Sequence, residues 1–197
     1  MNWNLFSPFI VHKNDFIESH KHWQAIAETR MPDVHAKRRS EWAAGRVALE
    51  EAFKTQGVYV DLGLAEFEGY QQLKSHPEWR FSISHTSDYA AALILPVTLS
   101  HGLGLDIESM AREVSAGVQE RSYHAGDNKT LSPLELWCAK EAVYKSLPGP
   151  IQQKIWLNSI QVGQGSFSIQ GHEDWFGHWA RQAHTELVII MAQAHQR

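Results

Sequence analysis

Two stretches near the N-terminus carry apolar residues at helical spacing. The first covers residues 18–30, where Trp23, Ile26 and Ala27 form the apolar stripe, and the second covers about residues 34–54. The segment Met31-Pro32-Asp33 separates the two predicted helices. Residues 55–80 are rich in turn-forming residues and are predicted to be a loop.

Further along the chain the pattern changes to the alternation that is typical of strands. It predicts strands over residues 81–85, 89–95 and 103–108, then an irregular or partly helical segment over 109–131. Three more strands are expected over 155–162, 166–170 and 186–192, with an aromatic turn at 175–179.

The clearest helix signal starts at Ser132-Pro133-Leu134-Glu135. It combines a serine at the N-cap, a proline at the first helical position and a glutamate at the third, which is a capping box. We expect this helix to continue to about Leu147 and to end at Pro148-Gly149-Pro150.

Composition limits the class of protein. The chain has 197 residues and is 43% hydrophobic, which suits one domain or two small halves that share a core. The formal net charge of −4 lacks the basic excess of a nucleic-acid-binding protein. A single cysteine excludes an intramolecular disulfide. We see no signal peptide and no apolar run of ~18 residues that could span a membrane, so we expect a cytoplasmic protein.

Two groups of acidic residues are candidates for chemistry. Asp106 and Glu108 alternate with Leu105 and Ile107, so the two carboxylates share one face of their strand. Paired carboxylates of this kind suit Mg²⁺, which binds carboxylates together with substrate phosphates. The alternative is a solvated strand end.

On the capped helix, Glu141 and Lys145 fall within an apolar stripe that includes Trp137 and Cys138. Charged groups in such a stripe need a partner, a ligand or a cleft. The alternative is an exposed i,i+4 pair worth ~0.3 kcal/mol.

Candidate anion-binding groups lie earlier in the chain. Arg39 and Arg46 are two helical turns apart on one face, and guanidinium groups bind phosphate in a bidentate manner. A solvated basic face is the alternative for the run Lys37-Arg38-Arg39. Ser84 and His85 end a predicted strand, a position where sites often occur.

Together these segments resemble motifs of the Sfp-type 4′-phosphopantetheinyl transferases. Residues 104–108 (GLDIE) are similar to the family's G-[VI]-D-[IVL]-E, and residues 137–145 (WCAKEAVYK) to W-[ST]-x-K-E-[AS]-x-x-K. Residues 84–86 (SHT) resemble S-H-S, and residues 39–46 resemble R-x-x-x-x-x-G-R. The order and separation of the four motifs fit the family over about residues 38–145. The departures are Leu105, Thr86 and Cys138, and a Gly-Lys-Pro segment that residues 73–77 match poorly.

The resemblance implies two similar α+β halves, residues 1–100 and 101–197, related by a pseudo-twofold with the active site at their junction. A weak similarity between residues 41–47 and 136–142 suits such halves. The resemblance also implies a holo-[acyl-carrier-protein] synthase activity, which moves 4′-phosphopantetheine from coenzyme A (CoA) to a serine of an acyl or peptidyl carrier protein and releases 3′,5′-ADP.

The resemblance also implies a role for each site residue. Mg²⁺ and the CoA pyrophosphate would be held by Asp106, Glu108 and Glu141, and Lys145 would contact the phosphates. Glu141, directly or through a metal-bound water, would be the general base. The CoA-binding residues would be Arg39, Arg46, Ser84, His85 and Lys145, while Arg38 and Lys74 are left open.

Two other classes of function use the same residues. A metal-dependent phosphohydrolase or nuclease could be built on the same carboxylates, and a non-catalytic module could bind CoA or a carrier protein. The sequence does not identify the carrier, which could serve fatty-acid, polyketide or non-ribosomal peptide synthesis. We expect a monomer, by resemblance to family members with two fused halves.

Overall fold

The computed structural model describes residues 7–63, 65–68 and 71–197, and it has an α+β architecture with two five-stranded antiparallel sheets. The first sheet has the strand order β1-β5-β4-β3-β2, and the second has the order β6-β10-β9-β8-β7. The strands of the first sheet are β1 (Phe9–His12), β2 (Phe67–Glu68), β3 (Gln72–Leu73), β4 (His76–His85) and β5 (Tyr89–Pro96). Those of the second are β6 (Gly102–Ser109), β7 (Ile160–Val162), β8 (Ser166–Ile169), β9 (Trp175–Gln182) and β10 (Leu187–Gln196).

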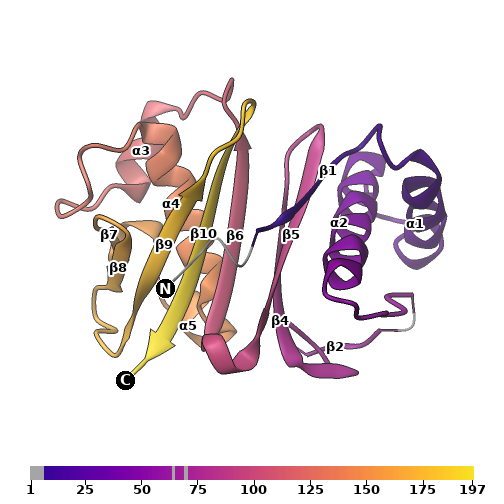
Figure 1. Ribbon diagram of the computed structural model, residues 1–197. Helices are drawn as coiled ribbons and strands as arrows, with labels where there is room; N and C mark the ends of the chain where they lie inside the picture. Colours follow the sequence, from indigo (N-terminus) through magenta and orange to yellow (C-terminus); the bar gives the residue numbers. More distant parts are fainter. Residues whose placement is uncertain (1–6, 64, 69–70) are drawn as a thin grey trace.

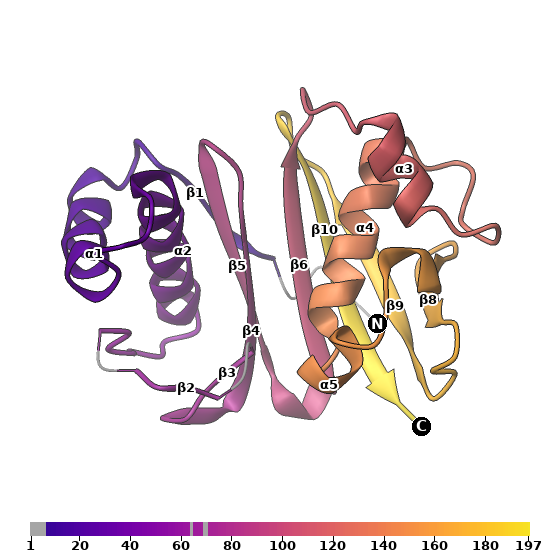
Figure 2. The same cartoon turned by 180° about the vertical axis from the view of Figure 1, so that it is seen from behind.

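The elements form four layers, helix on sheet on sheet on helix (Figures 1 and 2). Helices α1 (Ile17–Arg30) and α2 (Ala36–Thr55) cover the outer face of the first sheet. Helices α3 (Ala116–Ser122) and α4 (Pro133–Ser146) lie on the outer face of the second sheet, and the short α5 (Gly149–Gln152) follows α4. The described residues also include the 3₁₀ turns η2 (Val97–Leu99) and η3 (Leu157–Ser159).

Strand alternation explains why three separate apolar clusters form. Along β5, Leu93 and Leu95 point into a cluster between the two sheets, where they meet Leu105 and Ile107 of β6. The intervening side chains of β5, such as Ile94, point the other way into the cluster under α2. The apolar run of this strand is therefore buried on both faces.

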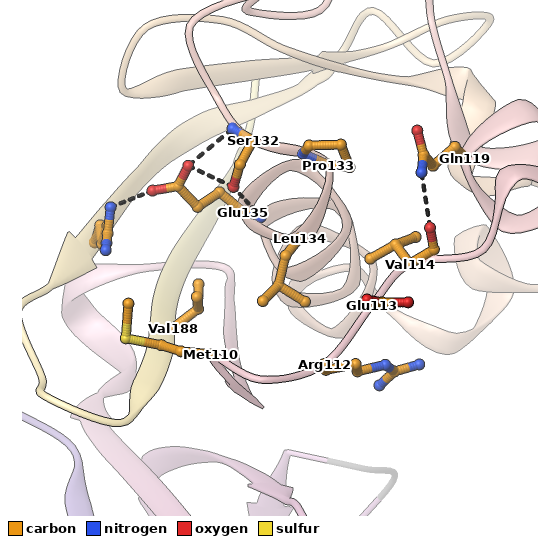
Figure 3. A pocket seen from close by; sticks show the side chains of 11 residues that line it. Met110, Arg112, Glu113, Val114, Gln119, Ser132, Pro133, Leu134, Glu135 and Val188 are labelled. Atoms are coloured by element: carbon orange, nitrogen blue, oxygen red, sulfur yellow. Dashed lines mark hydrogen bonds and ion pairs between the residues drawn. The ribbon is translucent and has the colours of Figure 1, made fainter.

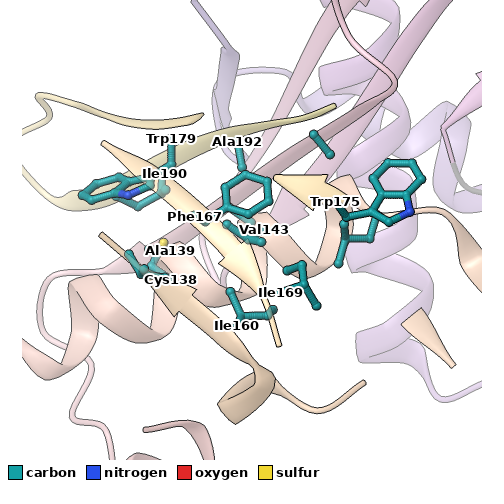
Figure 4. Packing of buried hydrophobic residues seen from close by; sticks show 14 of the residues in the cluster. Cys138, Ala139, Val143, Ile160, Phe167, Ile169, Trp175, Trp179, Ile190 and Ala192 are labelled. Atoms are coloured by element: carbon teal, nitrogen blue, oxygen red, sulfur yellow. The ribbon is translucent and has the colours of Figure 1, made fainter. Parts of the chain in front are cut away.

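The third cluster fixes α4 against the second sheet. Cys138, Ala139 and Val143 of the helix pack on β7–β10 side chains that include Phe167 and Ile190 (Figure 4). The start of α4 has the predicted capping box: the Ser132 hydroxyl accepts a hydrogen bond from the Glu135 amide at 3.3 Å, and the Glu135 carboxylate accepts one from the Ser132 amide at 2.8 Å. Both predictions about this helix, its start and its end near residue 147, are confirmed.

Helix α4 lies directly against the backbone of β6. A Cβ added at Gly104 would be 1.8 Å from the Ala142 carbonyl oxygen, and one at Gly102 would be 1.7 Å from that of Ser146. No side chain can occupy that space, so only glycine allows the helix to approach the strand this closely. The first residue of the GLDIE segment thus brings the helix with Glu141 and Lys145 next to the strand with Asp106.

The sequence predictions hold for most helices and central strands but were wrong in four places. Of residues 155–162, predicted to be one strand, only Ile160–Val162 form β7, and residues 157–159 form the turn η3. Residues 55–80, predicted to be a loop, contain β2, β3 and the first half of β4. The expected aromatic turn at 175–179 is the strand β9, in which Trp175, Gly177 and Trp179 are buried and the residues between them are more exposed. This period of two marks a strand, and the aromatic clustering hid it. Strand β1 was not predicted.

Within the described ranges, no helix combines the length and the apolar character that a membrane crossing requires.

The close contact between α4 and β6 gives a first prediction. Replacing Gly104 with alanine forces the helix away from the strand, and we expect Gly104→Ala to destabilise the fold by about 3 kcal/mol or more. Chemical denaturation measures this loss. The matched control is Gly117→Ala in α3, where an added Cβ meets no atom within 4 Å. Equal stability of the two variants would contradict the prediction.

Candidate active site

A cavity of about 710 Å³ lies where the two sheets meet near α2 and α4. It brings together side chains that are far apart in the sequence: Arg46 of α2, Ser84 and His85 at the end of β4, Asp106 of β6 and Lys145 of α4. These are five of the residues that the sequence analysis selected, and they come from both sheets and both large helices.

Asp106, which lines this cavity, belongs to the edge strand β6. Because β6 is the outermost strand of its sheet, alternate amides of its backbone have no partner strand. Side chains of the other half bond to three of them: Gln71 accepts a hydrogen bond from the Leu103 amide at 3.0 Å, and Ser82 accepts one from the Leu105 amide at 2.9 Å. Ser84 accepts one from the Ile107 amide at 3.3 Å. These bonds join the two sheets at the cavity.

Ser84, Asp106 and Lys145 form a closed network at the centre of the site. The Ser84 hydroxyl donates to Asp106 Oδ1 at 2.9 Å, and the Lys145 ammonium donates to the same oxygen at 2.7 Å and to Ser84 Oγ at 3.1 Å. A third bond from Lys145, of 3.2 Å, goes to the carbonyl of Leu105. The second oxygen of Asp106, Oδ2, is buried without a hydrogen-bond partner among the described residues.

Two further carboxylates lie near Asp106. Burial raises the pKa of Glu108, and so does the charge of Asp106, although the guanidinium of Arg112 binds Glu108 and opposes the shift. Burial also raises the pKa of Glu141, followed by the charge of Asp106, and Glu108 adds to the effect. The three acidic groups are therefore close enough to repel one another, as the sequence predicted for Asp106 and Glu108.

Glu141 has a position different from that of the other acidic residues. In the part of the chain that the structure describes, its carboxylate has no hydrogen bond and no ion pair, and it lines a neighbouring cavity of about 390 Å³. That cavity shares Tyr144 and Gln152 with the main one. Glu141 thus lies beside the main cavity and is free to bind a ligand there.

The carboxylates of Asp106, Glu108 and Glu141 have the chemistry of a metal site but not its geometry. Their oxygen ligands are of the type that Mg²⁺ prefers, and the unpartnered Oδ2 of Asp106 is a free acceptor among them. As they stand, however, no group of three or more His, Cys, Asp or Glu side chains within residues 7–63, 65–68 and 71–197 has the geometry of a metal site. The donor chemistry fits the ion, while Arg112 occupies one of the three ligands.

Arg46 provides a half-buried positive charge that lines the same cavity. Its guanidinium carbon lies 4.6 Å from the ring centroid of Trp42 and 4.4 Å from that of Phe67, so the group lies against two aromatic faces. Burial, with a contribution from Arg30, lowers the pKa of Arg46 to about 10. Its Nε is buried and has no hydrogen-bond partner among the described residues. A half-buried cation with no carboxylate partner among the described residues is suited to an anionic ligand.

A second group of charges lies at the rim. Arg38 Nη1 is 3.4 Å from His85 Nε2, and Glu41 lies 3.6 Å from Arg38 and 4.0 Å from His85. Burial lowers the pKa of His85, and the cations Arg38, Lys145 and Lys13 add to this effect against the opposing charge of Glu41. These effects favour the neutral form of the imidazole.

Two of the basic residues considered from the sequence lie elsewhere. Arg39 does not line the cavity, and its Nη1 donates to the carbonyls of Met31, Pro32 and Val34 in the connection between α1 and α2. Lys74 forms an ion pair of 2.7 Å with Glu66 and does not line the cavity either. Arg38, which the sequence left open, does line it.

The sequence analysis missed several residues that build the site. Gln71 reaches across the two halves, because its amide nitrogen donates to the Lys145 carbonyl at 2.5 Å while its oxygen binds the Leu103 amide. Ser82 precedes the Ser84-His85 pair by two residues and therefore shares its strand face, a signal that the sequence offered. No local pattern identifies Gln71, since its partners are more than 30 residues away.

A separate cavity of about 500 Å³ lies beside the first turn of α4 (Figure 3). Arg112, Leu134 and Glu135 line it, and Glu135 is held by the capping box and by Arg181. Arg112 connects this cavity to the acidic group through its ion pair with Glu108.

Comparison with known proteins adds nothing to this picture: no protein-family model matches the chain, and no curated protein matches it significantly.

The network at Ser84 gives a second prediction. Ser84→Ala leaves the Ile107 amide without an acceptor and removes a donor from Asp106, so we expect a loss of about 1–3 kcal/mol in the free energy of unfolding. Urea denaturation measures it. Ser166→Ala, at an exposed serine of β8, is the control and should change stability by less than about 0.5 kcal/mol. A fully stable Ser84→Ala variant would show that the contact between β4 and β6 does not depend on this hydroxyl.

Proposed function

We propose that this protein is a Mg²⁺-dependent 4′-phosphopantetheinyl transferase, which transfers the phosphopantetheine group of CoA to a serine of a carrier protein. The observation that carries the proposal is the single cavity lined by Arg46, Ser84, His85, Asp106 and Lys145. Four sequence segments with the family's motifs contribute to one site, or lie directly beside it in the case of Glu141. Segments that matched the motifs only by chance would not be expected to lie together in the folded protein.

The proposal includes the family's fold of two similar halves with the site between them. Each sheet has five antiparallel strands, and one long helix, α2 or α4, packs on its outer face. The weakly similar segments 41–47 and 136–142 lie on these two helices. This correspondence supports a pseudo-twofold relation between the halves, with β4 and β6 at the boundary.

Two groups of cations would bind CoA. Arg46, which is half-buried and has no carboxylate partner among the described side chains, would bind the nucleotide end together with the rim pair Arg38 and His85. Lys145 would contact the pyrophosphate, and it lies within 2.7 Å of Asp106, so its charge is already held at the carboxylates. Arg39 would not contact CoA; it would stabilise the connection between α1 and α2.

Asp106, Glu108 and Glu141 would hold Mg²⁺, with Arg112 released from Glu108. When bound, the ion supplies charge neutralisation at the pyrophosphate. The protein itself supplies position: Ser84 fixes the Asp106 carboxylate, and the ammonium of Lys145 stabilises negative charge on the departing phosphate.

The reaction is a phosphoryl transfer in which positioning dominates. The carrier serine oxygen forms a bond to the β-phosphorus of CoA, and the bond from that phosphorus to the bridging oxygen breaks. The electron pair leaves with 3′,5′-ADP. Glu141, whose carboxylate has no partner among the described residues, is placed to accept the serine proton. An acyl or peptidyl carrier protein is the proposed partner, and the proposed enzyme acts as a cytoplasmic monomer.

The decisive experiment incubates the protein with CoA, Mg²⁺ and a panel of apo carrier proteins. We expect a mass increase of the carrier by one phosphopantetheine group. Glu141→Gln should lower kcat by about 10²–10⁴-fold, because it removes the proton acceptor and a ligand while keeping the side chain's shape. Glu120→Gln, at an exposed residue of α3, is the matched control and should be fully active. Hydrolysis of CoA without carrier modification would instead indicate a phosphohydrolase.

Metal dependence is tested separately. Excess chelator should abolish transfer, and added Mg²⁺ should restore it in the wild type. Asp106→Ala should lose activity that Mg²⁺ restores only weakly, because the carboxylate that the Ser84 and Lys145 bonds hold in place is gone. Full transfer in the presence of chelator would contradict the assignment of these carboxylates, and CoA binding without any transfer would favour a non-catalytic binding module.

A further inference from the structure

Lys140 is a fully buried charge in the middle of α4. Its side chain is 0% exposed and forms an ion pair of 2.9 Å with Asp127, whose side chain is 2% exposed. The same ammonium donates to the carbonyl of Leu157 at 3.2 Å and to that of Ile160. All three donors of the ammonium are therefore used, and every partner is a protein oxygen.

Asp127 is equally well bound. Its Oδ1 accepts a hydrogen bond from the Val162 amide at 3.0 Å, and its Oδ2 accepts one from the His124 amide at 2.8 Å. The pair thus joins four parts of the second half: helix α4, the connection before it, the turn η3 and strand β7. A charge buried this deeply stays favourable only while these partners remain in place.

The residue that follows Lys140 is Glu141, and the two differ sharply in their contacts. The Glu141 carboxylate has no bonded partner in the described chain, so nothing beyond its own helix holds it near Asp106. Its place is fixed only by the position and rotation of α4 about its axis. On one side the glycine contacts with β6 set the distance of the helix from the strand. On another side, the Lys140 ammonium binds Asp127 and two backbone carbonyls, so it adds a polar anchor to the apolar packing of the helix.

We propose that Lys140, with Asp127, is a positioning residue that orients α4 so that Glu141 reaches the acidic group beside the cavity. This inference rests on the proposed transferase function. It assigns Lys140 no contact with CoA or with the carrier, because the side chain lies in the interior of the second half, away from the cavity.

A role in positioning and a role in stability lead to different results. Removing one member of a buried ion pair leaves the other charge unpaired and destabilises the fold, so circular dichroism must first show that the Lys140→Met protein is folded. If the pair only stabilises the fold, a folded variant keeps its catalytic rate. If it orients Glu141, the rate falls while CoA affinity, which depends on other residues, is retained.

The test measures kcat for carrier modification and the Kd of CoA by calorimetry in Lys140→Met. We expect kcat to fall at least tenfold and the Kd to change less than threefold. Ile169→Ala is the control, because it removes buried volume from the apolar cluster between α4 and the second sheet without breaking a side-chain hydrogen bond. A kcat within twofold of the wild type, or an equal loss of kcat in the control, would overturn the proposal.

Two further measurements keep the test decisive. If Lys140→Met does not fold, Asp127→Asn replaces it, since asparagine still offers an acceptor to one of the two amides; an unchanged kcat then overturns the inference. If the wild type modifies no carrier, the proposed function fails on its own. A crystal structure of the variant then decides on positioning, which is wrong if Glu141 keeps its place relative to Asp106.

Discussion

The arrangement of this protein depends on the free edge of one strand. Strand β6 ends its sheet, and its unpaired amides would normally need solvent, a covering element or another strand. Here Gln71, Ser82 and Ser84 of the other half supply the acceptors, and Lys145 supplies a donor to the Leu105 carbonyl. The two sheets are thereby joined through polar side chains at the same place where their apolar faces pack together. The site lies at this seam because polar groups are already required there.

Close packing of α4 against β6 is the second constraint on the site. Two glycines let α4 lie against the strand backbone, which brings Lys145 within 2.7 Å of Asp106. Burial then raises the energy of every charge in the region, so that the pKa values of Glu108 and Glu141 rise and that of Arg46 falls. Asp106 and the half-buried guanidinium of Arg46 line the same cavity, so groups of opposite charge lie around one space.

The sequence predicted the elements whose signals are local. The capping box placed the start of α4 correctly, and alternation placed the core of β4, β5 and β6. It also predicted that Leu105 and Ile107 point into the core, as they do. The strand β9 was misread because closely spaced tryptophans suggest a turn, and β2 and β3 are too short to show a period. Of the charged residues that line the cavity, the sequence selected Arg46, Asp106 and Lys145 but not Glu41, and it selected Arg39, which lies elsewhere. Gln71 and Ser82 were missed, since contacts such as Gln71 to Lys145 depend on the fold.

Two lysines of α4 show where sequence reasoning stops. Lys140 and Lys145 belong to the same motif-like segment and have the same chemistry. The sequence alone does not show which of the two binds a ligand. Burial separates them: Lys140 has every donor bound to a protein oxygen in the interior, while Lys145 lines the cavity beside a carboxylate. One lysine fixes the helix and the other faces the ligand space. The two lysines of one segment therefore have different surroundings, and only the fold reveals the difference.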